Sequence, residues 1–390
     1  MKRKLSLLLC LLMIITSFTA CTQGQGTSTS GSDSDVIKIG VFEPLTGENG
    51  GGGQQELDGM IYANKVYPTV LGKKVELVIV DNKSDKAEAA TAVSRLIEKE
   101  KVVAILGSYG SGVSIAAGDI IKNAKIPAMG ASCTNPMVTQ GNEFYFRACF
   151  LDPFQGKVMA NYAVGKGAKT AAVIMQNGDD YSVGLGNFFI DAFTELTGSP
   201  ASIVDESYFQ TNDTDFNAIL TNIKAKNPDV IFAPSSATTA PLIIKQARAL
   251  GIDALIMGGD TWENPAVVDV AGADAEGIVL STFFDENDPV TEEAKKFVEG
   301  YKKELAGKEP IIPAVAALGY DAYILMLNAI ERAGSTDGTA IKDALNSTKD
   351  FEGVTGLINF TEEGDADKNM AVIKTVDKGQ FVFIDTVTVK

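Results

Sequence analysis

The sequence predicts an α/β protein built from two doubly wound parallel-sheet lobes. Its 390 residues suffice for two domains, each large enough to bury a core. From residue 36 onward, apolar runs typical of strands alternate with amphipathic stretches. Such alternation is typical of parallel strands whose two faces are both covered by helices. Because the apolar runs fall into two successive series, we expect two lobes.

Nine stretches are expected to form strands, four in the first series and five in the second. They are Val36–Glu43, Val75–Asp81, Val102–Gly107 and Pro127–Gly130, then Ala171–Gln176, Ser202–Tyr208, Val230–Ala233, Ala254–Gly258 and Gly277–Thr282. Helices are expected between them, for example over Asp85–Lys99 and Phe216–Lys226. The second of these stretches carries apolar residues at positions i, i+3, i+4 and i+7, which share one helix face.

Three further segments connect these series or follow them. The interval Tyr145–Pro153 lies between the two series and is the first candidate crossover. Two helical stretches, Thr291–Leu305 and Ala314–Ala333, follow the second series and are expected to return to the first lobe. The tail alternates like antiparallel strands around Asp377-Lys378-Gly379.

The N-terminus has the pattern of a bacterial secretory signal. Positive residues at 2–4 precede an apolar run at 5–15 and then small residues. The segment Phe18–Cys21 resembles a lipobox, in which cleavage before the cysteine leaves a lipid-modified Cys21. A plain signal peptide with an incidental cysteine is the alternative. The stretch 22–35 is rich in Gly, Ser and Thr and is expected to be a flexible tether. We therefore expect anchoring to the outer face of the cell membrane.

Charge and composition argue against several classes of protein. The formal net charge is −16, with 50 acidic and 34 basic residues, which disfavours binding to nucleic acid. The sequence contains no histidine, so His-dependent triads, His-ligated metal sites and imidazole acid–base catalysis are excluded. The chain has no G-x-x-x-x-G-K-[ST] motif, which argues against a nucleoside triphosphatase.

Two loops that follow strands of the first series offer a site for a small anion. Residues 108–112 follow one strand, and residues 131–136 follow the next. Both loops supply hydroxyls and backbone N–H groups at the positive ends of helices, which suits a carboxylate. Ser111 and Thr134 could instead be ordinary helix caps. Two adjacent loops of the same kind favour the anion site.

Loops of the second series supply the opposite charge. Asp260 follows a strand, beside the single tryptophan, and would accept an ammonium group; alternatively it caps the helical stretch 264–270. Tyr181 could cover an apolar face of a ligand or pack against the helix that follows it. Ser236 could donate another hydrogen bond or act as a cap.

Seven stretches carry a resemblance to a known family. They are IKIGVFEPLTG, VVAILGSYGSGVS, AMGASCTNP, FRACFLDPFQG, TDFNAILTNIKAKNPDVIF, KQARALGI and MGGDTWENP. In this order and spacing, the chain from about Val36 to Lys390 resembles the leucine/isoleucine/valine-binding family of extracytoplasmic solute receptors for ABC importers. The resemblance implies the type I periplasmic-binding-protein fold, in which two lobes joined by three crossovers close over a ligand.

The resemblance also implies a function. It implies a monomeric receptor, not an enzyme, that binds an amino acid of the branched-chain or a related type and delivers it to an ABC permease in the membrane. It implies no cofactor and no metal. By the same likeness Ser111, Ser132 and Thr134 would hold the α-carboxylate, while Ser132 and Asp260 would take the α-ammonium. Tyr181 and Ser236 would close the site from the second lobe.

The expected division of the chain follows from this likeness. Residues 1–20 would be the signal peptide and 21–35 the tether, with 36–151 and 284–356 as the first lobe and 152–283 and 357–390 as the second. Two departures from the family pattern leave the ligand's side chain open. Gly50–Gly53 replace an aromatic residue in the first loop and predict a roomier or more mobile wall. Asp260 stands where branched-chain-specific members have Glu.

The sequence leaves open two rival functions and a possible disulfide bond. A secreted hydrolase could use Ser111 or an Asp pair such as Asp179-Asp180, although no base lies near Ser111 in the sequence. A ligand-sensing module of the same fold is the other rival. Cys133 and Cys149 are either a disulfide or two buried thiols.

Overall fold

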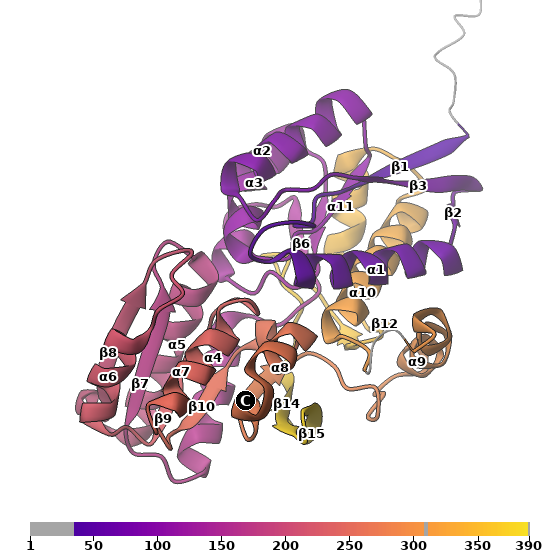
Figure 1. The fold of residues 1–390 in the computed structure, drawn as a ribbon. Coiled ribbons are helices and arrows are strands. Elements are labelled where there is room, and N and C mark those ends of the chain that lie inside the picture. Colours follow the sequence, from indigo (N-terminus) through magenta and orange to yellow (C-terminus); the bar gives the residue numbers. More distant parts are fainter. Residues whose placement is uncertain (1–34, 308–310, 389–390) are drawn as a thin grey trace, which may run out of the picture. The chain divides into compact units, whose positions relative to one another are not determined.

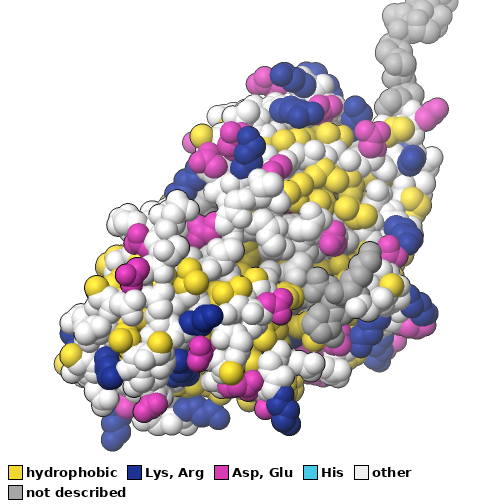
Figure 2. Space-filling view, viewed as in Figure 1, with side chains coloured by type: hydrophobic (Ala, Val, Ile, Leu, Met, Phe, Trp, Pro, Cys, Tyr) yellow, Lys and Arg dark blue, Asp and Glu magenta, His cyan; other side chains and the backbone are white. Residues whose placement is uncertain are grey.

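A computed structural model describes residues 35–307 and 311–388. They form two large, mainly parallel sheets with helices packed on both faces (Figure 1), which confirms the predicted α/β class with two parallel-sheet lobes. The predicted signal peptide and Cys21 lie outside the described residues. The face of the molecule in Figure 2 carries acidic and basic side chains interspersed.

The first sheet has six strands in the order β2-β3-β1-β4-β5-β6. The strands are β1 (Val36–Val41), β2 (Thr69–Val70), β3 (Lys73–Ile79), β4 (Ala104–Leu106), β5 (Ala128–Gly130) and β6 (Tyr145–Arg147). Neighbouring strands are parallel except for β2 and β3, which form an antiparallel pair. The chain winds away from β1 in both directions, so a crevice opens beyond the carboxyl ends of β1 and β4.

Helices from both ends of the chain accompany this sheet. They are α1 (Gly50–Val66), α2 (Lys86–Arg95), α3 (Ser111–Ala124), α9 (Glu292–Leu305), α10 (Ala314–Ala333) and α11 (Gly338–Asn346). Figure 1 shows α10 and α11, in light orange, among the indigo and purple N-terminal elements. The hairpin of β12 (Phe351–Gly353) and β13 (Gly356–Ile358) follows.

Helix α10 has the bounds that the sequence predicts. It is long and apolar enough to cross a membrane by length and composition, but 89% of its most apolar window is buried inside the protein. It therefore serves as a core helix here. It packs closely on α1 through glycines, since a Cβ atom added at Gly59 would lie 1.9 Å from the Ala316 carbonyl oxygen.

The second sheet has seven strands in the order β15-β14-β11-β10-β9-β7-β8. They are β7 (Ala171–Gln176), β8 (Ile203–Phe209), β9 (Val230–Phe232), β10 (Leu255–Gly258), β11 (Val279–Thr282), β14 (Met370–Asp377) and β15 (Gln380–Thr388). Its helices are α4 (Asp152–Gly165), α5 (Asp180–Thr197), α6 (Asn217–Lys226), α7 (Ala240–Ala249) and α8 (Pro265–Ala271). The antiparallel tail around Lys378-Gly379 is confirmed as β14 and β15.

The structure corrects three details of the sequence prediction. Tyr145–Arg147 forms strand β6 of the first sheet, so the first crossover is shorter than predicted and leads directly into α4. The helix predicted over Asp85–Lys99 ends as an α-helix at Arg95 and continues as a π-helical turn over Leu96–Glu100. The two-residue strand β2 was not predicted.

The third passage between the sheets comes late in the chain. Residues after β13 still contact the first lobe, because Asp365 forms a 2.6 Å ion pair with the buried Arg147 and accepts a 2.8 Å hydrogen bond from Thr139. The chain joins the second sheet where β14 begins, at Met370.

Both cysteines of the described residues are buried and free. Burial raises the pKa of Cys133 to about 12 and that of Cys149 well above its usual value. Neither takes part in a disulfide, so the second of the two alternatives holds.

Candidate ligand-binding site

A cavity lies where loops from the carboxyl ends of both sheets meet. The space between its lining atoms is about 350 Å³, part of which is open to solvent. Its lining residues include Asn49, Tyr109, Gly110, Ser111, Ser132, Asp179, Tyr181, Ser236, Asp260 and Thr261. Five of the six residues predicted to bind ligand are in this set. The sixth, Thr134, is fully buried and does not belong to this set.

The first lobe contributes the N-terminal end of α3. Gly110 is the N-cap of this helix, and its first residue, Ser111, makes no side-chain cap. Instead the Ser111 hydroxyl accepts a 3.2 Å hydrogen bond from the Asn135 amide and so ties the two predicted loops together. Since the first N–H groups of a helix lack partners within it, this end suits a carboxylate.

Thr134 does not act as a helix cap either. The cap of the 3₁₀ turn Pro136–Val138 is Asn135, whose side chain accepts from the Met137 amide. The Thr134 hydroxyl oxygen is buried and makes no hydrogen bond of standard geometry among the described residues, although it lies beside the Asp152 carboxyl and lowers the pKa of that group.

The second lobe contributes a buried carboxylate. Asp260 is 3% exposed and begins a 3₁₀ turn directly after β10. Its Oδ1 atom accepts hydrogen bonds of 2.9 Å from the Tyr181 hydroxyl and 2.8 Å from the Gln155 amide. Burial raises the pKa of Asp260 to about 6, although both donors favour the ionised form. Asp260 does not cap α8, because Asn264 does.

The two lobes are joined across the cavity by a residue that the sequence reasoning missed. Glu48, in the loop before α1, accepts a 2.8 Å hydrogen bond from the Ser236 hydroxyl and a 3.1 Å hydrogen bond from the Gln176 amide. Lys86 and Asp180 form a 2.7 Å ion pair at the same junction. The structure is therefore closed at this edge. Gln155, on α4, was missed as well.

The glycines at the start of α1 do not form a roomy wall. Gly50–Gly53 make the first turn of α1, and Gly52 and Gly53 are buried. A Cβ atom at Gly52 would lie 2.3 Å from the Tyr109 ring, and one at Gly53 would lie 2.1 Å from the Pro44 carbonyl oxygen. The prediction of a roomier wall was wrong because the Tyr109 ring fills the space beside Gly52 and Pro44 fills the space beside Gly53.

A pair of buried glutamates lies behind the first-lobe loops. Glu56 is fully buried on α1 and accepts a hydrogen bond from the Ser132 hydroxyl. Glu43, fully buried after β1, accepts a 2.7 Å hydrogen bond from the Tyr109 amide. Burial raises the pKa of Glu56 to about 7, and burial together with the Glu56 charge raises the pKa of Glu43 well above its usual value.

Two other carboxyls near the cavity are also perturbed. Burial raises the pKa of Asp179, which caps α5, to about 6 and that of Asp152, at the start of α4, to about 8. Among the described residues, no group of three or more cysteine, aspartate or glutamate side chains is placed to hold a metal ion.

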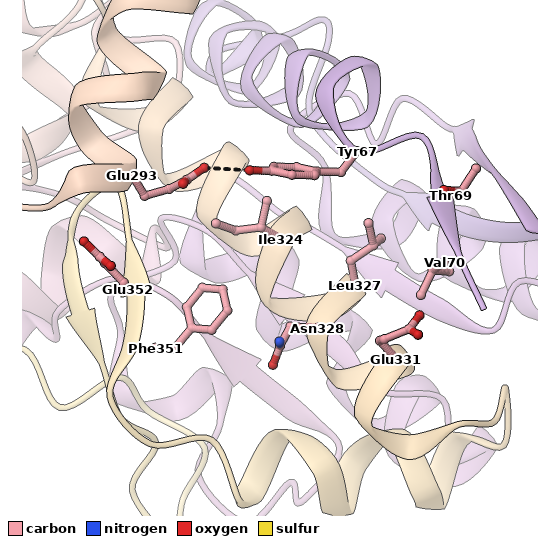
Figure 3. A pocket seen from close by; sticks show the side chains of 10 residues that line it. All are labelled: Tyr67, Thr69, Val70, Glu293, Ile324, Leu327, Asn328, Glu331, Phe351 and Glu352. Carbon is pink, nitrogen blue, oxygen red and sulfur yellow. Dashed lines mark hydrogen bonds between the residues drawn. The ribbon is translucent and has the colours of Figure 1, made fainter. Parts of the chain in front are cut away.

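A second cavity lies on the first lobe alone (Figure 3). Its apolar wall includes Ile324 and Leu327 of α10, and glutamates lie at its edge. Those carboxylates already accept structural hydrogen bonds: Glu293 from Tyr67 at 3.0 Å and Glu331 from the Leu71 amide at 2.9 Å. None of the residues predicted to bind ligand lies there, so the cavity between the lobes is the better candidate.

Two lobes with a shared polar cavity at the carboxyl ends of their strands define a two-lobed solute-binding receptor. The model of the periplasmic binding protein family matches residues 36–380 of this chain. The chain therefore belongs to that family, whose members are substrate-binding receptors acting outside the cytoplasm.

One relative and two solved structures show which members of the family this chain is similar to. Leu/Ile/Val-binding protein homolog 3 of Brucella melitensis is 26% identical over 90% of this chain and 94% of its own. The crystal structure of the leucine-binding protein LivK from Thermotoga maritima is 42% identical, with a TM-score of 0.86 over 90% of this chain and 99% of that one. The branched-chain amino-acid transporter protein LivJ from Streptococcus pneumoniae, solved with isoleucine, is 34% identical, with a TM-score of 0.83 over the same shares.

Proposed function

We propose that this chain is a lipid-anchored receptor that binds an amino acid, of the branched-chain or a related type, between its lobes and delivers it to an ABC permease. The proposal rests chiefly on Asp260. This buried carboxylate faces a polar cavity and forms no salt bridge among the described residues. A buried carboxylate without a cation is costly, so a ligand ammonium would stabilise it.

The opposite pole of the ligand fits the first lobe. The N-terminal end of α3 and the Ser111 hydroxyl are suited to a carboxylate, and the family resemblance adds the Thr134 hydroxyl. An α-amino acid carries both charges on neighbouring atoms and would bridge the lobes. Tyr181 and Ser236 would complete the site from the second lobe, as the family resemblance implies. The similar proteins are named for binding leucine, isoleucine or valine, and this supports the same class of ligand.

The two sheets with their helices are proposed to move as lobes. The first would comprise 36–151 with the segment from 284, and the second 152–283 with the C-terminal hairpin. The boundary expected after residue 356 is placed in this proposal between Asp365 and Met370, because Asp365 remains paired with Arg147. Closure by rotation at three such connections is a known form of hinge motion.

The ligand class is tested by calorimetry with a panel of the twenty amino acids and small amides. We expect tight one-to-one binding of at least one α-amino acid and no turnover of it. A chain that binds none of them, or that consumes a bound compound, would overturn the proposal in favour of another ligand class or of the secreted hydrolase.

The anchor is tested separately in cells. Stable anchoring takes about two hydrophobic signals, which a multiply acylated Cys21 would supply. Cys21→Ser should leave the protein unprocessed or release it to the medium. A variant that is still cleaved before residue 21 and bound to the membrane would show that Cys21 is not the anchor.

A further inference from the structure

We propose that Glu56 is a specificity residue: it holds the Ser132 hydroxyl as a hydrogen-bond acceptor for the ligand's ammonium group, so that the first lobe selects for an amine. This inference rests on the proposed function. Glu56 lies behind the lining of the cavity, and the role inferred for Ser132 differs from the one that the family resemblance implies.

The first step is the direction of one hydrogen bond. The Ser132 hydroxyl donates to the Glu56 carboxylate, and Ser132 lines the cavity. A serine hydroxyl has one proton and two lone pairs. With its proton committed to Glu56, the oxygen can offer only lone pairs to a ligand, which suits an ammonium and repels a carboxylate.

The second step is the state of the glutamate pair. The carboxyl groups of Glu43 and Glu56 perturb each other's pKa, and a hydrogen bond between two carboxyl groups needs one proton. Burial and the neighbouring charge favour keeping that proton on Glu43, whose other oxygen accepts from the Tyr109 amide. Glu56 then accepts from both Glu43 and Ser132, and it carries the negative charge above its pKa of about 7.

Among the described residues, no side-chain cation pairs with the charge of Glu56. Neither glutamate forms a salt bridge within residues 35–307 and 311–388. Helix α10 approaches Glu56 through Gly319, where an added Cβ atom would lie 2.1 Å from the Glu56 carbonyl oxygen. The charge of Asp260 also raises the pKa of Glu56, which places both carboxylates within electrostatic reach of the same cavity.

The ammonium is therefore held from two sides, by Asp260 of the second lobe and by Ser132 with Glu56 of the first. Because the Ser132 hydroxyl does not donate to the ligand's carboxylate, that carboxylate is bound by the N-terminal end of α3, Ser111 and Thr134. This division differs from the dual role that the family resemblance implies for Ser132.

The experiment compares an amino acid with the same molecule lacking its amine. The probes are leucine and 4-methylpentanoate, or the matching pair for whichever amino acid binds best in the panel. Binding is measured by calorimetry for the wild type, Glu56→Gln, Ser132→Ala and the double variant, with thermal melting to check folding. Glu98→Gln is the matched control, because Glu98 is an exposed glutamate of the first lobe that lies outside both the cavity and the glutamate pair.

Glu56→Gln should weaken amino-acid binding at least tenfold and change binding of the deaminated acid by less than threefold. In the Ser132→Ala background the same substitution should have less than a third of that effect on a logarithmic scale, and Glu98→Gln should stay within threefold of the wild type. Equal weakening of both probes, or no change in either, would overturn this inference while leaving the proposed function intact. A wild type that binds no amino acid would overturn the proposed function, and this inference with it.

Discussion

At the scale of single residues, the account depends most on the charge of Asp260. Removing one partner of a desolvated charge pair costs roughly 2–5 kcal/mol of binding free energy. Asp260→Ala should therefore weaken binding of the cognate amino acid at least tenfold, as measured by calorimetry. Asp253→Ala is the control, since Asp253 is exposed and precedes β10, whereas Asp260 follows that strand. Unchanged affinity in Asp260→Ala would remove Asp260 from the site.

The residues that sequence reasoning found share one property. Ser111, Ser132 and Asp260 stand directly after apolar strand runs, and in an open parallel sheet those positions meet at one edge. Glu56 gave no such signal, because it lies inside α1 and is 76 positions from Ser132 in sequence. The only sign of Glu56 in the sequence is that a charged residue stands on the buried face of a helix. Which face is buried cannot be assigned before the partner helix is known.

At the scale of elements, the contact between α1 and α10 should be the most sensitive to volume. A side chain at Gly59 would meet the backbone of Ala316 at 1.9 Å, and backbone cannot move aside as a side chain can. Gly59→Ala should lower the free energy of unfolding by about 1–3 kcal/mol in denaturant titration.

The matched control for this prediction is Gly165→Ala, at the end of α4. An added Cβ atom there would have no neighbour within 4 Å. It should change stability by less than about 1 kcal/mol. Equal effects of the two substitutions would mean that close packing of α1 on α10 does not limit stability.

Elements were predictable where a long pattern determined them. The 20-residue apolar pattern of α10 and the strand Ala171–Gln176 have the predicted bounds. The short strands β2 and β6 were not found, because two or three residues do not establish a period. The π-helical turn at Leu96–Glu100 was missed because its residues fit a helical pattern equally well.

At the scale of the whole molecule, the buried carboxyls predict how stability depends on pH. Glu56, Asp152, Asp179 and Asp260 have pKa values raised to about 7, 8, 6 and 6, whereas an unfolded chain releases these protons near pH 4. The folded protein thus binds more protons than the unfolded chain between these values. Its free energy of unfolding, without ligand, should fall as the pH rises from about 5 to about 8.

Denaturant titrations across this pH range measure the effect. Asp152→Asn should flatten the upper part of the profile, between about pH 6 and pH 8, because it removes the group with the highest numerical pKa of the four. A stability that rises with pH over the whole interval would contradict the assignment of these groups as acids whose burial outweighs the effect of nearby cations.

The central claim is that one amino acid bridges both lobes and holds them closed. The N-terminal end of α3 belongs to the first lobe and Asp260 to the second, so neither lobe alone satisfies both charges of the ligand. A ligand that contacts both lobes binds the closed form better and shifts the population toward it. Small-angle X-ray scattering of the wild type, with and without the cognate amino acid, measures this most directly. The account predicts a smaller radius of gyration with saturating ligand. An unchanged scattering profile at saturation, with binding verified by calorimetry, would contradict it.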